Sequence, residues 1–213
     1  GITVNLAQGT ATGNASVGLD TLRGIEEIRG TSFDDFFDAR GFSGNSDNIG
    51  SNGYNGQRNV FEGAGGNDTV TGNGATWVSY WSSMVAINAN LGEGFVDGLE
   101  DQSSDAYRLS LGHDTLIGVY GLTGSQFGDF LAGGGSGETA GIHPWEIFEG
   151  AAGNDTIDGG DGFDFALYTS SPEGIEVDLR EGDLAGFNES HVGRASDGFG
   201  SVDVLYDIEG VIG

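Results

Sequence analysis

Residues 150–167 read G-A-A-G-N-D-T-I-D followed by G-G-D-G-F-D-F-A-L, and this stretch decides the fold. It consists of two consecutive nonapeptides of the form G-G-x-G-x-D-x-U-x, in which U is a large apolar residue and one Ala replaces the second Gly. The glycines permit a tight turn with positive φ, and the eighth-position residues Ile157 and Ala166 begin a very short strand that faces a core. Each nonapeptide forms half of a coil, so successive nonapeptides lie on opposite edges of a stack.

Acidic residues occupy the sixth position of these nonapeptides, and this placement points to a metal. Asp155 and Asp164 would bring hard carboxylate oxygens to the turns, and such oxygens suit Ca²⁺ better than a soft metal. A further well-preserved nonapeptide, G-A-G-G-N-D-T-V-T, spans residues 63–71, and less regular copies span residues 30–38 and 124–132. Their sixth-position residues are Asp68, Asp35 and Asp129, respectively.

The nonapeptides belong to a longer repeat with a period of 87 residues, measured from Phe61 to Phe148. Each period opens with three apolar residues that alternate with polar ones, and continues with a D-T-L or D-V-L segment before the next nonapeptide. The repeat predicts three units, at residues 1–84, 85–174 and 175–213, and the third is expected to be truncated. The chain is therefore expected to be a piece of a longer repetitive protein.

Short apolar patches, frequent turn signals and the lack of a sustained i, i+3, i+4 pattern predict an all-β chain. Stacked nonapeptides predict a parallel β-roll or β-helix, which is a solenoid, with long loop insertions and β-rich decorations. The least repetitive segments, residues 39–59, 93–113 and 133–145, are rich in Gly, Ser and Asn. We expect them to form loops that project from one edge of the stack.

The composition argues against several classes of partner. Asp and Glu number 33 against seven Lys and Arg, all of them Arg, so the formal net charge is -26. Such a chain repels nucleic acid and anionic membrane surfaces and attracts cations, which would also reduce its self-repulsion on folding. It has no Cys for a disulfide or a thiolate metal site, and it has no apolar run long enough for membrane insertion.

The alternation of nonapeptides between two edges predicts which carboxylates meet. The first and third nonapeptides of a unit lie on the same side, so we expect Asp35 beside Asp68 and Asp129 beside Asp155. Neighbouring coils lie about 4.7–4.9 Å apart, and at that spacing two carboxylates and the turn carbonyls between them can share one Ca²⁺. The alternative is that these are ordinary Asx and glycine turns without metal. The predicted metal-binding residues are Asp35, Gly63, Gly66, Asp68, Asp129, Gly150, Gly153, Asp155, Gly159, Gly162, Asp164 and Glu146.

A second predicted site lies on the opposite edge. Asp164 would meet Glu146, which occupies the matching sixth position of the preceding coil. In the first unit Asn59 and Trp77 take these positions, so no metal site is expected there. Three further acids precede the apolar D-T-L or D-V-L strands, where they are either ligands or caps of turns and strands: Asp20, Asp114 and Asp203.

Other chemistries have little support in the sequence. His113, His143 and His191 lack the spacing of a zinc site. There is no G-x-S-x-G motif, and a chain without Lys has no phosphate-binding loop or Schiff base. Carboxylates are so abundant that a pair resembling a glycosidase dyad carries no information. We therefore predict that the chain is not an enzyme. Four aromatic residues are either core and end-capping residues or a sugar-stacking platform: Trp77, Tyr80, Trp81 and Trp145.

These motifs resemble the RTX (haemolysin-type calcium-binding) repeat regions of secreted bacterial proteins. The resemblance covers nearly the whole chain and is specific at residues 63–71 and 150–167. It implies export by a one-step, type I secretion machine and folding outside the cell when calcium binds. Two departures from the family pattern, the insertions that interrupt the nine-residue register and Trp77 in place of a ligand, favour a short roll.

The leading hypothesis is a calcium-binding structural or adhesive repeat segment of a large extracellular RTX protein, with folding coupled to Ca²⁺ binding. The expected partners are calcium ions, further copies of the repeat in the parent chain, and cell-surface or extracellular polysaccharide. Two alternatives remain open. One is a polysaccharide-active β-helical enzyme in which carboxylates converge with Arg108 or Arg180, and the other is a carbohydrate-binding adhesin module that uses Trp81 and Trp145.

Overall fold

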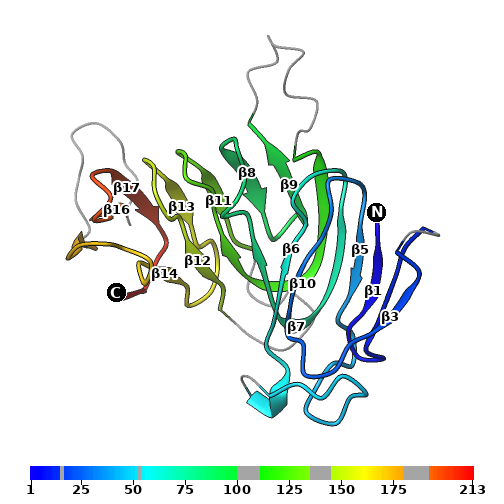
Figure 1. The fold of residues 1–213 in the computed structure, drawn as a ribbon. Coiled ribbons are helices and arrows are strands. Elements are labelled where there is room, and N and C mark those ends of the chain that lie inside the picture. Colours follow the sequence, from blue (N-terminus) through cyan, green and yellow to red (C-terminus); the bar gives the residue numbers. More distant parts are fainter. Residues whose placement is uncertain (15–16, 52–53, 100–110, 135–144, 180–191) are drawn as a thin grey trace, which may run out of the picture.

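The computed structural model describes residues 1–14, 17–51, 54–99, 111–134, 145–179 and 192–213. Over these residues the chain is almost entirely β, with one 3-10 turn at Tyr54–Gly56 and no α-helix. Successive coils follow one another along a single axis, with the first unit at one end and the third at the other (Figure 1). The sheet is mixed and does not close into a barrel, and the all-β prediction is confirmed.

One face of the roll contains the strands that follow the sixth-position acids of the nonapeptides. The eighth-position apolar residues face the core as predicted. Phe37 and Val70 lie in register and are at most 1% exposed. Further along the chain, Leu131 and Ile157 also lie in register and are buried. The first parallel group is β1 (Thr3–Asn5), β5 (Phe36–Asp38), the first part of β7 (Thr69–Ser79) and the first part of β10 (His113–Thr123). The second is β8 (Ile87–Asn90), β11 (Phe130–Ala132), β13 (Thr156–Asp158) and β17 (Val202–Tyr206).

The other face is parallel throughout. Its inward residues include Phe61, Leu122 and Phe148, which are buried and stand in register with their neighbours. Phe61 stacks on Phe37 of the first face with ring centroids 4.7 Å apart, so the two faces meet in a thin apolar core. The strands are β4 (Glu27–Arg29), β6 (Asn59–Glu62), the second parts of β7 and β10, β12 (Ile147–Glu149), β14 (Phe165–Leu167) and β18 (Gly210–Ile212).

The strands β7 and β10 pass from one face to the other without a break. Each is 11 residues long, and both bend through the bottom of the roll in Figure 1. Their pairing shifts register between Ile117 and Val119 and again between Val119 and Gly121, which marks the bend. These two strands therefore join the faces by backbone as well as by side-chain packing.

Each repeat unit opens with a three-stranded antiparallel meander, a decoration added to the parallel roll. The meanders are β1–β2–β3, β8–β9–β10 and β15–β16–β17. Strand β9 (Phe95–Gly98) and the start of β10 lie within residues 93–113, so the prediction that this whole segment is a loop was wrong. Residues 100–110 and 135–144 of the predicted loops lie outside the described residues. The remaining meander strands are β2 (Thr10–Thr12), β3 (Leu19–Thr21), β15 (Glu176–Asp178) and β16 (Val192–Ser196).

Candidate metal site on the acidic turns

A ladder of aspartates runs along one edge of the first half of the roll. The backbone N–H of Asp35 donates to Oδ1 of Asp68 at 2.8 Å, and the N–H of Asp68 donates to Oδ1 of Asp114 at 2.8 Å. The N–H of Ile2 donates to Oδ1 of Asp35 at 2.6 Å. Each carboxylate thus binds the backbone of the coil before it, and the structure brings Asp35 and Asp68 onto adjacent turns as their spacing predicts.

The second half of the roll repeats this ladder. Oδ1 of Asp129 accepts the N–H of Ile87 at 2.8 Å, and Oδ1 of Asp155 accepts the N–H of Asp129 at 2.8 Å. Oδ1 of Asp203 accepts the N–H of Asp155 at 3.0 Å. The structure therefore brings Asp129 and Asp155 together. It also places Asp114 and Asp203 in the ladders, where the sequence left a choice between ligand and cap.

Glycine is required at the first position of the well-preserved turns because the carboxylate lies against it. A Cβ on Gly63 would meet Oδ2 of Asp68 at 1.8 Å, and a Cβ on Gly150 would meet Oδ2 of Asp155 at 2.2 Å. The fourth-position residues Gly66 and Gly153 have φ of 109° and 129°, respectively. The second position also has positive φ, at 77° for Ala64 and 71° for Ala151.

The well-preserved turns leave one carboxylate oxygen without a partner. Oδ2 of Asp68 and Oδ2 of Asp155 are buried and have no hydrogen-bond partner among the described residues. Asp68 as a whole is 2% exposed and Asp155 is 1% exposed. A buried carboxylate oxygen without a donor is costly, so these two atoms need a proton or a cation.

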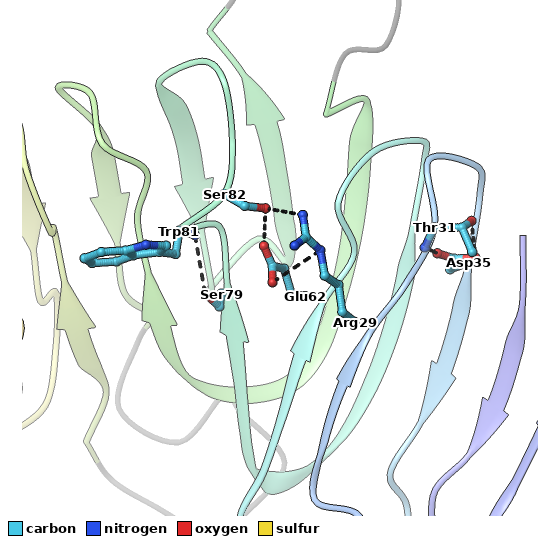
Figure 2. A network of polar contacts seen from close by, with 7 residues as sticks. All are labelled: Arg29, Thr31, Asp35, Glu62, Ser79, Trp81 and Ser82. Carbon is cyan, nitrogen blue, oxygen red and sulfur yellow. Dashed lines mark hydrogen bonds and ion pairs between the residues drawn. The ribbon is translucent and has the colours of Figure 1, made fainter.

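The less regular turns satisfy their aspartates internally. The Thr31 N–H donates to Oδ2 of Asp35 at 2.5 Å and its hydroxyl donates to Oδ1 at 3.0 Å, as Figure 2 shows. Ser125 does the same for Asp129, at 2.6 Å from its N–H and 2.7 Å from its hydroxyl. A second-position Ser or Thr thus replaces the positive-φ residue and supplies both donors, so these turns need no ion to satisfy their carboxylates.

The pKa values distinguish Asp68 and Asp155 from Asp129. Burial raises the pKa of Asp68 to about 8, with a further contribution from the charge of Asp114. Burial likewise raises the pKa of Asp155 to about 8, and the charge of Asp203 adds to it against the hydrogen bond from the Asp129 amide. For Asp129 burial raises the pKa only to about 6, because the donors from Ile87 and Ser125 oppose it.

Asp197 is a buried acid that the sequence analysis missed. It lies in the β16–β17 hairpin, where Oδ1 accepts the N–H groups of Phe199 and Ser201, each at 2.9 Å. Oδ2 of Asp197 and Oδ2 of Asp203 have no hydrogen-bond partner among the described residues, and both side chains are fully buried. The charge of Asp197 raises the pKa of both Asp155 and Asp203, after burial. The D-G-x-G pattern at residues 197–200 was the available signal.

Two tyrosines reach the ladders from the other face of the roll. The Tyr80 hydroxyl donates to Oδ2 of Asp114 at 2.9 Å and both groups are buried. Tyr168 takes the matching place near Asp203, but its hydroxyl lies outside hydrogen-bonding geometry and has no described partner. Tyr80 is therefore a core residue that hydrogen-bonds to the aspartate ladder, and it does not belong to an exposed sugar-stacking platform.

The opposite edge carries a shorter ladder in the second and third units. The Glu146 N–H donates to Oδ1 of Asp164 at 2.7 Å, and the Asp164 N–H donates to Oε2 of Glu209 at 2.7 Å. Oδ2 of Asp164 is buried without a partner among the described residues. Gly162 has φ of 157° in the same turn. Asp164 and Glu146 are thus brought together as predicted, while Glu209 was missed.

The first-unit assignment of this edge was wrong by one residue. Asn59 pairs with Thr76, and Val60 pairs with Trp77, so Thr76 takes the position that was given to Trp77. The turn before Thr76 is one residue shorter than a nonapeptide. Trp77 instead lies flat on Gly121, whose added Cβ would meet the indole at 2.1 Å, and its Nε1 donates to Thr123 at 2.8 Å.

An acidic hollow of about 690 Å³ adjoins the short ladder. A Cβ on Gly159 would meet the Asp207 carbonyl oxygen at 2.2 Å, so the coils are closely stacked beneath the hollow. Burial and the charge of Asp207 raise the pKa of Asp158, against a hydrogen bond from the Gly160 amide. The lining is oxygen-rich and consists of Asn90, Gly92, Glu93, Gly133, Gly134, Asp158, Gly160, Asp161 and Asp207.

The remaining candidate residues lie on the surface. Trp81 is 43% exposed and Trp145 is 36% exposed. Figure 2 shows the Trp81 ring turned away from a polar network in which Arg29 contacts Glu62 and Ser82. His113 pairs with Asp97 at 2.7 Å on the surface, and Asp20 lies exposed on β3. His143, His191, Arg108 and Arg180 lie outside the described residues.

Within the described ranges, no three Asp, Glu or His side chains converge closely enough to hold a metal ion by themselves. An ion here would therefore need turn carbonyls in addition to carboxylates. No helix among the described residues is long and apolar enough to cross a membrane. No protein-family model matches the chain, and none of the curated proteins matches its sequence.

Proposed function

We propose that the chain is a calcium-stabilised structural or adhesive repeat segment of a large extracellular protein, of the kind found in RTX proteins. One observation carries the proposal: Oδ2 of Asp68 and Oδ2 of Asp155 are buried on stacked glycine turns without a donor. A divalent cation would supply the missing positive charge at both places. Calcium is favoured because every candidate ligand is a hard oxygen.

The ligands would come from the well-preserved turns and from the coils on either side. Asp68 with the backbone of residues 63–66 forms one candidate site, next to Asp35. Asp155 with the backbone of residues 150–153 forms the second, next to Asp129. Asp164 with residues 159–162 and Glu146 forms a third, on the opposite edge. The second-position donors at Thr31 and Ser125 make Asp35 and Asp129 the weaker ligands of each pair.

Calcium would act on folding rather than on a substrate. The chain carries a formal charge of -26 and its buried ladders contain several carboxylates with raised pKa, so the folded state repels itself when no cation is bound. An ion that binds the folded turns and not the unfolded chain stabilises the fold by mass action. By comparison with extracellular calcium modules, we expect affinities of roughly 10⁻⁴–10⁻³ M. The role we propose is therefore non-enzymatic.

A calcium titration followed by circular dichroism and thermal unfolding tests the proposal. We expect the melting temperature to rise with millimolar Ca²⁺ and to return to its starting value with excess chelator. Mg²⁺ at the same ionic strength is the control, and it should give a much smaller rise because it resists dehydration. A melting temperature that is equal in excess chelator and in millimolar calcium would support the alternative of Asx turns without metal and reject the proposal.

Carbohydrate binding is the second candidate, favoured by the exposure of Trp81 and Trp145. An exposed indole offers the flat apolar surface on which a sugar ring stacks. Glycan-array binding that is lost in Trp81→Ala and Trp145→Ala would support this role. Binding that persists in both variants would remove these residues from it.

A further inference from the structure

The first-unit end of the roll presents two open strand edges. Among the described strands β3 pairs only with β2, and β4 pairs only with β6. The hydrogen bond from Leu22 N–H to the Gly9 carbonyl fixes which side of β3 is occupied, so the Thr21 N–H points to the open side. Likewise the Val60 N–H donates to the Glu26 carbonyl, so the Glu27 N–H points to the open side of β4.

The equivalent strands of the other units are covered by nonapeptide strands. In the second unit β10 lies on β7, with the Thr115 N–H donating to the Asp68 carbonyl at 2.8 Å. In the third unit β17 lies on β13, with the Val204 N–H donating to the Asp155 carbonyl at 2.8 Å, and β18 lies on β14. In both cases the aspartate just before the donating residue, Asp114 or Asp203, accepts the N–H of the sixth-position residue in return.

Burial shows the same difference between the units. Leu116, Val119 and Leu122 of the second unit are at most 4% exposed beneath their neighbouring coil. Their first-unit equivalents are Leu22, Ile25 and Ile28, and Ile25 is 38% exposed while the other two are half-buried. The open edges are therefore accompanied by an uncovered apolar row, which is an aggregation risk unless another strand pairs with it.

We propose that this end face, formed by β3, β4, Leu22, Ile25 and Ile28, binds a coil of two nonapeptides from a further unit of the same repeat. The coil would have the form of residues 150–167. Its sixth-position N–H would donate to Asp20, its sixth-position carbonyl would accept from Thr21, and its eighth-position apolar residues would cover Leu22 and Ile28. The occupant is selected by equivalence: β3 and β4 correspond to β17 and β18, which pair with the nonapeptide strands β13 and β14.

A tandem chain tests the proposal, since G-I-E-V-D-L at residues 174–179 aligns with G-I-T-V-N-L at residues 1–6. Residues 146–174 are joined ahead of Ile2 in place of Gly1, and hydrogen exchange is compared with that of the 213-residue chain in millimolar calcium. We expect the Thr21 and Glu27 amides to exchange roughly tenfold or more slowly in the tandem chain. Asp20→Ala should lower the melting temperature of the tandem chain but leave that of the 213-residue chain unchanged, and Asp20→Asn, which keeps an acceptor, should have a smaller effect.

Two outcomes would overturn the proposal. One is equal exchange of Thr21 and Glu27 in both chains, with the added segment open to proteolysis. The other is concentration-dependent protection of these amides in the 213-residue chain together with a doubled mass in sedimentation, which would make a second copy the occupant.

Discussion

The backbone N–H of Asp129 lies 2.8 Å from Oδ1 of Asp155, while the other oxygen of the Asp155 carboxylate is buried without a described partner. One carboxylate therefore joins two coils and leaves half of its hydrogen-bonding capacity unused. The Asp35–Asp68 pair repeats the arrangement in the first unit. Because one oxygen accepts the hydrogen bond between coils and the other has no described partner, a mutation can remove the charge and keep the hydrogen bond.

Replacing Asp155 by Asn should stabilise the chain in chelator and weaken its response to calcium. The amide oxygen can still accept the Asp129 N–H, while the buried charge is removed. We expect a gain of about 1–3 kcal/mol without calcium, measured by urea unfolding, and a smaller calcium-induced rise in melting temperature. Asp47→Asn is the matched control, because Asp47 is exposed and its replacement changes the net charge equally. Equal effects of the two variants would assign the change to net charge alone.

Stability without calcium should fall as the pH rises. The pKa of Asp68 and of Asp155 is raised from 3.8 to about 8 in the folded chain, so between about pH 4 and pH 8 the folded state binds more protons than the unfolded state. Each carboxylate contributes a slope of at most about 1.4 kcal/mol per pH unit, and solvent screening reduces it. Unfolding in chelator at pH 5 and pH 8 measures the slope. The Asp68→Asn, Asp155→Asn double variant should flatten it, and an unchanged slope would assign it to other groups.

Calcium should oppose this loss of stability at high pH. Calcium binds the deprotonated carboxylates, so the rise in melting temperature that it causes should be larger at pH 8 than at pH 5. A larger rise at pH 5 would contradict a site built on Asp68 and Asp155.

A methyl group at Gly63 should break the first well-preserved turn. The added Cβ would lie 1.8 Å from Oδ2 of Asp68, so either the carboxylate or the turn must move. We expect a loss of about 1–3 kcal/mol and a loss of calcium response from the first unit. Gly174→Ala provides the control, because a Cβ there meets nothing within 4 Å. Similar losses in both variants would show that the contact with Asp68 is not responsible.

The two ladder tyrosines should respond differently to removal of their hydroxyls. Tyr80→Phe deletes the 2.9 Å hydrogen bond to Asp114 and leaves that buried carboxylate short of a donor, so we expect a loss of about 1–3 kcal/mol. Tyr168→Phe removes a hydroxyl that has no described partner and should be nearly neutral. Thermal unfolding of both variants at pH 8 in chelator measures the difference. A larger loss at Tyr168 would show that its hydroxyl does bond to Asp203.

Much of the fold followed from local rules in the sequence. Sixth-position acids and eighth-position apolar residues predicted the pairing of Asp129 with Asp155 and the burial of Ile157, because a nonapeptide fixes its own turn and strand. The register at Trp77 was missed because β7 continues across the bend, and a turn one residue shorter moves Thr76 into line. Whether calcium fills the turns stays a prediction.

Asp197 and Glu209 were missed for a different reason. Neither lies in a nonapeptide: Asp197 lies in the β16–β17 hairpin turn and accepts local hydrogen bonds from Phe199 and Ser201, while Glu209 is brought to its partner by the stacking of coils. Glu209 meets Asp164 at a sequence separation of 45 residues. The antiparallel β8–β9 pair was hidden for another reason, since the residues of β9 were grouped with the irregular insertion at residues 93–113.

The uninterrupted strands β7 and β10 have a consequence for the order in which the coils would unfold. Where other coils turn at an acidic corner that depends on charge balance, these two cross from face to face as one hydrogen-bonded ribbon. If calcium binds at the acidic corners as we propose, chelation would loosen these corners, whereas the pairing of β7 with β10 would persist. Unfolding would therefore start with the coils at the two ends of the roll. The paired strands β7 and β10 would stay folded, and the other coils could refold on them when calcium is added again.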